Sequence, residues 1–241
     1  MSQSIRVRLT FTEGMLGTKS ADAEVFKNYI ASKAPDALTK EEEVDKHGTE
    51  EVFDKARTVF FKTEDGEPFL YDYQIKGFFK DACSMLSRLT KKNADGKKVP
   101  ENESGKLSAY KKVIDGLIFP APREIVIKVN GEITDCQRPL RAQTAQGERV
   151  CLASSDEVPA GSTIEFEVLC LDDSHVKAVR EWLDYGRLRG IGQWRNSGAG
   201  RFNWDELDAD GNVIGGNNEY EQRAERYRPV ADLFKGTVPL G

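Results

Sequence analysis

The order in which two kinds of apolar spacing follow one another is the feature that most limits how this chain of 241 residues can fold. Apolar residues at every second position, as in "SIRVRLTF" (4–11), are typical of a half-buried strand. Apolar residues at helical spacing predict helices over 22–34, 73–89 and 174–188. The chain therefore begins with a strand and a helix, and strand-like runs separate the later helices.

Turn residues divide the remaining strand-like runs into pairs. Asp65-Gly66 lies between two apolar runs within 56–73, which predicts a β-hairpin, and similar runs flank Asn130-Gly131 and Pro159-Gly161. "RFNWDEL" (201–207) predicts a last strand. Hairpin-connected strands pair antiparallel, and helices among them indicate an α+β fold. We expect a ferredoxin-like (RRM-like) antiparallel sheet core with helices on one face and loop insertions.

Charge is segregated along the chain, although the formal net charge is only −5. Residues 36–54 contain eight acids against two lysines, whereas residues 88–112 contain eight lysines or arginines against three acids. The basic segment is the least apolar of the chain, which predicts a long loop. We expect one domain over 1–207 that carries these acidic and basic insertions. An exposed hairpin and a polar tail would follow at 208–241.

Composition excludes several classes of protein. With 39% hydrophobic and 31% charged residues, the chain is typical of a folded globular protein. No apolar run approaches the roughly 18 to 20 residues that a membrane helix needs, and the N-terminus lacks the pattern of a signal peptide. The four cysteines form no C-x-x-C pair, and there are two histidines. We therefore expect a cytoplasmic protein with reduced thiols and with no metal, no cofactor and no membrane contact.

The stretch "RGIGQWRNSGAGRF" (189–202) is the strongest candidate for a binding site, because it combines glycines, arginines and a tryptophan without an acid. Glycines permit positive φ, and backbone N–H groups freed in such turns can hold phosphates. Arginines donate in a fork that suits phosphate oxygens, and Trp194 would either stack on a base or pack on the core. The alternative is a turn with solvated arginines. The candidate residues are Arg187, Arg189, Gly190, Gly192, Gln193, Trp194, Arg195, Asn196, Gly198, Gly200 and Arg201.

Motifs of common nucleotide enzymes are absent from the sequence. It contains no G-x-x-x-x-G-K-[ST] motif and no zinc deaminase signature, and the glycine-rich stretch lacks the G-x-G-x-x-G spacing. His47 and His175 are weak candidates for acid–base catalysis, and helix capping is the simpler explanation of His175 and of Asp22. Near the glycine-rich stretch lie Asp184, Asp205 and Glu206, without the spacing of a carboxylate pair. We expect a protein that is not an enzyme.

Three motifs in the same order resemble those of the RAMP superfamily, the repeat-associated RNA-binding proteins of CRISPR effector complexes. "GIGQWRNSGAGRF" (190–202) resembles their C-terminal glycine-rich loop, and "EVPAGSTIEFEVLCL" (157–171) the strand pair of the backbone-subunit branch. "GEPFLYDYQIKGFFKDA" (66–82) is similar to their hairpin-into-helix segment. There Lys76-Gly77 matches the Lys-Gly of the family, while Lys80 stands where an arginine is common and Tyr71-Asp72-Tyr73 replaces Pro-Gly-Ser.

The resemblance implies a single-stranded nucleic acid bound across the sheet and the glycine-rich loop. It implies phosphate contacts for Lys76 and Lys80, against the alternative of a solvated helix face. In the basic segment, it implies a nucleic-acid-facing or subunit-bridging role for Lys91, Lys92, Lys97 and Lys98. Backbone members assemble along a guide RNA, as homo-oligomers or within a multi-subunit nucleoprotein complex. The alternatives are a stand-alone binder of single-stranded DNA from a mobile element, an endoribonuclease of the same fold, and an inhibitor that binds a protein through the acidic segment.

Overall fold

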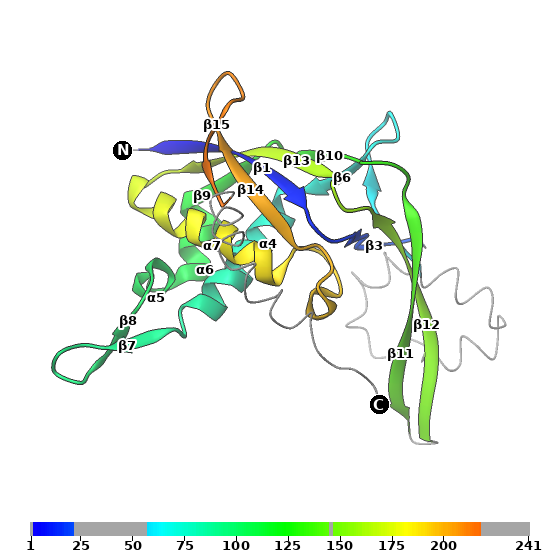
Figure 1. Ribbon diagram of the computed structural model, residues 1–241, viewed down its shortest axis with the longest axis horizontal. Coiled ribbons are helices and arrows are strands. Elements are labelled where there is room, and N and C mark those ends of the chain that lie inside the picture. Colours follow the sequence, from blue (N-terminus) through cyan, green and yellow to red (C-terminus); the bar gives the residue numbers. More distant parts are fainter. Residues whose placement is uncertain (1, 22–56, 145–146, 218–241) are drawn as a thin grey trace, which may run out of the picture.

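The computed structural model describes residues 2–21, 57–144 and 147–217, which form an α+β fold around an antiparallel sheet (Figure 1). The sheet has eight strands, and β9 pairs with β13 beside the main path. Along that path the strands are β15 (Val213–Gly216), β14 (Phe202–Leu207), β1 (Gln3–Phe11), β13 (Thr163–Cys170), β10 (Glu124–Lys128), β6 (Pro68–Tyr71) and β5 (Phe61–Lys62). The eighth strand, β9, covers Ile118–Ala121.

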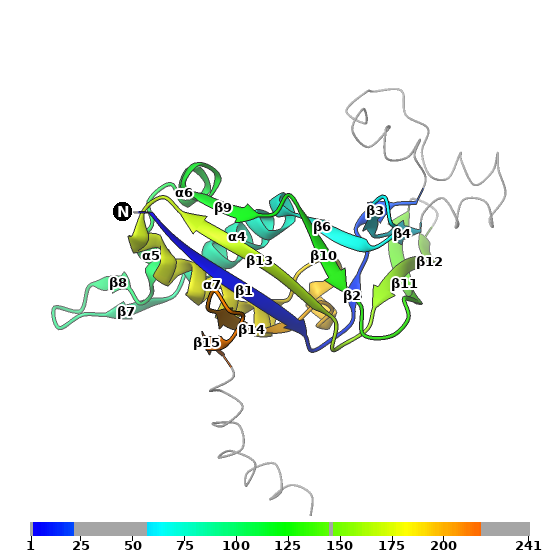
Figure 2. The same cartoon turned by 90° about the horizontal axis from the view of Figure 1, so that it is seen from above.

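The centre of this sheet has the ferredoxin-like arrangement that the sequence predicts. In chain order its elements are β1, α4 (Asp72–Leu86), β9 and β10, β13, α7 (Val176–Arg189) and β14. In space β14, β1 and β13 lie side by side and antiparallel, with β9 and β10 beside β13. Helices α4 and α7 cover one face of the sheet (Figure 2). The predicted strand at 4–11 and the predicted helices at 73–89 and 174–188 are confirmed within a few residues.

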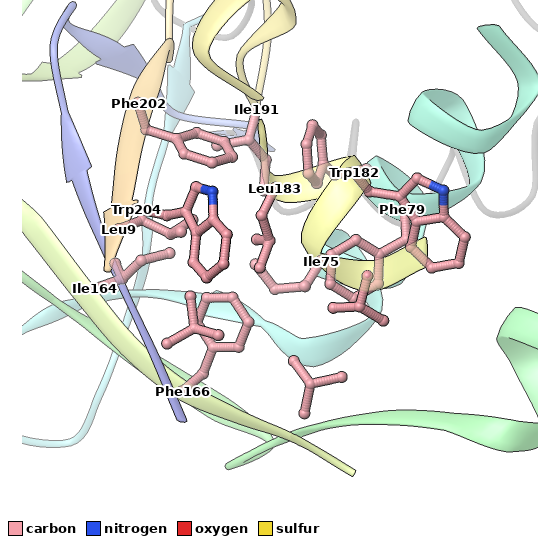
Figure 3. Packing of buried hydrophobic residues seen from close by; sticks show 14 of the residues in the cluster. Leu9, Ile75, Phe79, Ile164, Phe166, Trp182, Leu183, Ile191, Phe202 and Trp204 are labelled. Atoms are coloured by element: carbon pink, nitrogen blue, oxygen red, sulfur yellow. The ribbon is translucent and has the colours of Figure 1, made fainter. Parts of the chain in front are cut away.

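The core lies between the sheet and these two helices. In β1, Ile5, Val7, Leu9 and Phe11 are buried, as a period of two requires. The rings of Phe79 on α4 and Trp182 on α7 have their centroids 5.3 Å apart. Figure 3 shows Phe202 and Trp204 of β14 pointing into the same layer. Burial of these apolar side chains is what holds the helices on the sheet.

A second sheet contains β11 (Thr134–Thr144) and β12 (Gly147–Val158), which the predicted turns at 130–131 and 159–161 would pair with strands of the first sheet. It is formed by β11, β12, β4 (Thr58–Val59), β3 (Lys19–Ser20) and β2 (Met15–Leu16). The β11–β12 hairpin extends far from the helices (Figure 1). β12 and β13 flank the predicted turn at Pro159-Gly161 but lie in different sheets, because β12 pairs with β11 and β13 pairs with β1. β10 and β11 are divided in the same way at Gly131.

The prediction of a loop over the basic segment is wrong for most of its length. The segment folds into a hairpin of β7 (Thr90–Lys92) and β8 (Lys98–Pro100), then α5 (Glu103–Lys106) and α6 (Tyr110–Leu117). The Glu181 carboxylate on α7 accepts hydrogen bonds from the backbone N–H groups of Glu103 and Ser104 and from the Ser104 hydroxyl. This tertiary contact satisfies the start of α5, so its fold does not depend on local apolar spacing.

Several predictions concern residues outside the described ranges. These are the helix at 22–34 with Asp22, the acidic segment 36–54 with His47, and the tail beyond 217. The hairpin expected from 208 onward begins earlier: it is formed by β14 and β15, which continue the main sheet. Among the helices of the described ranges, none is long and apolar enough to cross a membrane.

Candidate nucleic-acid interface

The glycine-rich loop between α7 and β14 is folded tightly on itself. The Ile191 N–H donates to the Gly200 carbonyl at 2.9 Å, and Gly200 has a φ of +70°. A Cβ on Gly200 would lie 1.9 Å from the Ile191 carbonyl oxygen, so only glycine fits there. The N–H groups of Gly190, Gly198 and Gly200 donate to carbonyls of the protein, which means that these three do not form the phosphate cradle expected of them.

An acid from another element pairs with two arginines of the loop. Asp81 on α4 accepts through Oδ2 from Arg189 Nε at 2.9 Å and from Arg195 Nη1 at 2.8 Å. A further donor of Arg189 is bonded to Asn196 Oδ1 at 2.8 Å, and Arg201 Nε donates to the Leu188 carbonyl at 3.1 Å. Because a guanidinium has five donors, the arginines keep N–H groups that can bind another anion.

Trp194 stands outside the core. The residue is 46% exposed, so the alternative in which it packs on the core is wrong. Its backbone has a left-handed φ of +53°, and the Arg138 guanidinium lies 5.3 Å from its ring centroid. Arg138 in turn donates to Gln193 Oε1 at 3.0 Å and to Ser155 Oγ at 3.2 Å. These contacts join the tryptophan to the base of the β11–β12 hairpin and fix the ring in place.

Two hollows flank Trp194 and have opposite chemistry. The arginine hollow is lined by Arg189, Arg195 and Asn196 in addition to the tryptophan. The carboxylate hollow lies between the loop and the β1–β2 turn, and its polar lining includes Glu13 and Glu157. Trp194 therefore lines both a hollow whose charged groups donate hydrogen bonds and a hollow whose charged groups accept them. The carboxylate hollow was not predicted, since it combines residues from four distant segments.

Lys76 and Lys80 lie on the face of α4 that meets α6 and β9. Lys80 Nζ forms a salt bridge with Asp115 Oδ1 at 2.6 Å. Lys76 Nζ donates to the Asp115 carbonyl at 3.1 Å and lies 4.3 Å from the centroid of the Phe119 ring. Neither side chain contributes to the hollows beside Trp194, because the neighbouring Asp81 is the residue that turns toward the loop.

The four lysines of the β7–β8 hairpin are far from the loop. Lys91, Lys92, Lys97 and Lys98 are exposed, and no ion pair within the described ranges involves them. Both views place this hairpin at one end of the molecule and the β11–β12 hairpin, which contacts the loop, at the other (Figures 1 and 2). The structure thus divides the predicted interface into three separate places.

The open face of the main sheet carries paired charges. Arg8 Nε donates to Glu165 Oε1 at 2.9 Å, and Arg6 Nη2 to Glu165 Oε2 at 3.2 Å. Burial alone would raise the pKa of Glu165, but the hydrogen bond from Arg8 and the charge of Lys128 hold that pKa below its ordinary value. The centre of this face is therefore an ion-pair network, in which the arginines already have an anionic partner.

The acids considered for catalysis do not converge. Asp184 Oδ1 accepts from Trp204 Nε1 at 2.8 Å, and burial raises its pKa. Glu206 accepts two hydrogen bonds from Arg180. Asp205 is its neighbour on β14, and successive strand residues point to opposite faces of the sheet, so the two carboxylates point away from each other. His175 is buried, and Asp172 caps the turn that contains it. Within the described ranges, no group of three or more potential metal ligands occurs.

No family model and no curated protein sequence matches this chain. Among solved structures, one with a similar chain path is a chain of the type III-B Cmr-beta complex bound to cognate target RNA. The identity is 12% and the TM-score 0.46, over 83% of this chain and 58% of that chain. Another is Cmr6 from Pyrococcus furiosus, with 10% identity and a TM-score of 0.42 over 84% of this chain and 98% of that one.

Proposed function

We propose that this protein binds single-stranded RNA as a RAMP-type subunit, without catalysing a reaction. It would assemble along a guide strand with copies of itself or with other subunits. The observation that carries the proposal is Trp194, an exposed residue of the glycine-rich loop that lines both hollows. An exposed aromatic ring beside guanidinium groups is the combination by which proteins bind single strands.

Arginine chemistry supports the same proposal. Arg189 and Arg195 each donate one N–H to Asp81, and these hydrogen bonds fix both guanidinium groups beside Trp194. A strand whose base stacks on the ring brings its phosphate within reach of the remaining donors. The resemblance of the glycine-rich loop, the hairpin-into-helix segment and the strand pair to RAMP proteins favours RNA over DNA.

Fluorescence anisotropy with labelled strands tests the proposal. Single-stranded RNA, single-stranded DNA and a duplex, each of about 30 nucleotides, are titrated at about 50 and 200 mM salt. We expect tight, salt-sensitive binding to the single-stranded RNA. Preference for the DNA strand would assign the protein to DNA coating, and no binding to any of the three would refute the proposal. Incubation of a hairpin RNA with and without EDTA is expected to leave the RNA intact.

A charge-matched pair of triple variants locates the interface. Joint substitution of Arg189, Arg195 and Arg201 by alanine removes three cations from the loop. If each contacts a phosphate, the slope of log Kd against log salt falls by about 2. The control replaces Arg6, Arg8 and Lys128 by alanine, which removes the same charge from the open sheet face. Equal losses in both variants would contradict binding at the loop.

A further inference from the structure

The carboxylate hollow beside Trp194 has the chemistry of a base pocket, an inference that rests on the proposed function. Glu157 lies on β12 directly opposite Leu16 of β2, and both residues line the hollow with Trp194. A Cβ on Gly14 would lie 1.9 Å from Glu157 Oε1. The absence of a side chain at Gly14 is therefore what gives the carboxylate its place against the β1–β2 turn.

The Glu157 carboxylate lies against the Cys136 thiol, a weak donor that lines the same hollow, and keeps acceptor positions for a ligand. Among the described residues, no salt bridge involves it. An ionised carboxylate only accepts hydrogen bonds, so it repels phosphate and selects groups that donate. Guanine is the RNA base whose Watson–Crick edge presents two adjacent donors, N1–H and the 2-amino group, which match the two oxygens of a carboxylate. Adenine, cytosine and uracil each present a single donor group on that edge.

The charges around the ring favour a base over a cationic side chain of a partner protein. Arg138 already lies 5.3 Å from the centroid of the Trp194 ring, and the arginine hollow, which Trp194 also lines, adds Arg189 and Arg195. A second cation on the ring would meet three guanidinium groups. A neutral base on an anionic backbone would be attracted by the same groups, because its phosphate can lie in the arginine hollow.

We propose that the carboxylate hollow binds a guanine of the RNA strand, with Trp194 stacking on the base and Glu157 accepting hydrogen bonds from its N1–H and 2-amino groups. Arg138 is then a positioning residue, since it fixes the ring through Gln193 and Ser155. Gly14 serves the same pocket by leaving room for the carboxylate.

The experiment compares oligouridines of about 12 nucleotides that differ only at one central position, which is guanosine, inosine, adenosine or uridine. Inosine lacks only the 2-amino group of guanosine. The wild-type protein is expected to bind the guanosine strand about tenfold more tightly than the others, as a hydrogen bond to a charged group implies. In Glu157→Gln this preference is lost, while affinity for the uridine strand does not fall, because the variant also removes a charge that repels phosphate. The control Glu124→Gln, at an exposed position on β10, keeps the preference.

The outcomes separate this inference from the proposed function. Equal affinity of the wild-type protein for all four strands overturns the guanine pocket and leaves RNA binding intact. No binding to any strand overturns both. A guanosine preference that survives in a folded Glu157→Gln variant, checked by its melting temperature, overturns the role of Glu157. An arginine-rich peptide that binds the wild type but not Glu157→Gln, and competes with the guanosine strand, would assign the hollow to a protein side chain.

Discussion

Gly186 on α7 tests whether close packing against β14 requires a glycine. A Cβ at Gly186 would lie 2.0 Å from Cζ of Phe202, whose ring is fully buried. That ring has Phe78 at 5.4 Å and Phe11 at 6.5 Å between centroids, so it cannot move outward without displacing other core rings. The substitution Gly186→Ala therefore adds a methyl group where the core has no space.

The magnitude follows from two opposing effects. Alanine favours a helix over glycine by about 1 kcal/mol, and overpacking of a core costs about 1–3 kcal/mol. Gly77 on α4 is the matched control, because a Cβ there meets nothing within 4 Å. We expect Gly77→Ala to stabilise the protein by up to about 1 kcal/mol. Gly186→Ala is expected to be less stable than Gly77→Ala by about 1–3 kcal/mol, because the helix effect cancels between the two variants.

Urea denaturation followed by far-UV circular dichroism measures this difference. Each variant is compared with the wild type by its midpoint and its m-value. A difference of 1 kcal/mol corresponds to a shift in Tm of about 2–4 °C for a chain of this size. If both alanine variants are stabilised equally, the Phe202 ring has room to move, and the argument from close packing is refuted.

Two further predictions concern acids that contact functional or core elements. Asp81→Asn removes the carboxylate shared by Arg189 and Arg195, so RNA affinity is expected to rise a few-fold and to depend more steeply on salt. An anisotropy titration measures both, and weaker binding would mean that Asp81 is needed to orient the arginines. Burial raises the pKa of Asp184 in the folded protein, so folding favours the protonated form of this group. The stability that it contributes is present below about pH 4 and is lost as the pH rises through its pKa in the folded protein. Asp184→Asn, which can still accept from Trp204, is therefore expected to gain stability relative to the wild type on going from about pH 4 to pH 7 in denaturant titrations, and a difference that does not change with pH would contradict this.

Local spacing predicts elements whose burial follows one face. The strand at 4–11 and the helices at 73–89 and 174–188 could be read from the sequence, since each puts its apolar residues on a single buried side. The hairpin at Asp65-Gly66 could be read as well, because Gly66 adopts the positive φ of its turn. Helix α6 escaped this reasoning, because it buries only Ile114 fully and depends on α4 for its packing.

The sequence by itself therefore determined the α+β fold, the main elements and the composition of the glycine-rich loop, all of which depend on residues close together in the chain. Only the tertiary structure decided that Asp81 pairs with Arg189 and Arg195, that Trp194 is exposed, and that Glu157 and Gly14 line a hollow beside it. These contacts join segments far apart in sequence, and their energies arise from three-dimensional packing that no local pattern encodes.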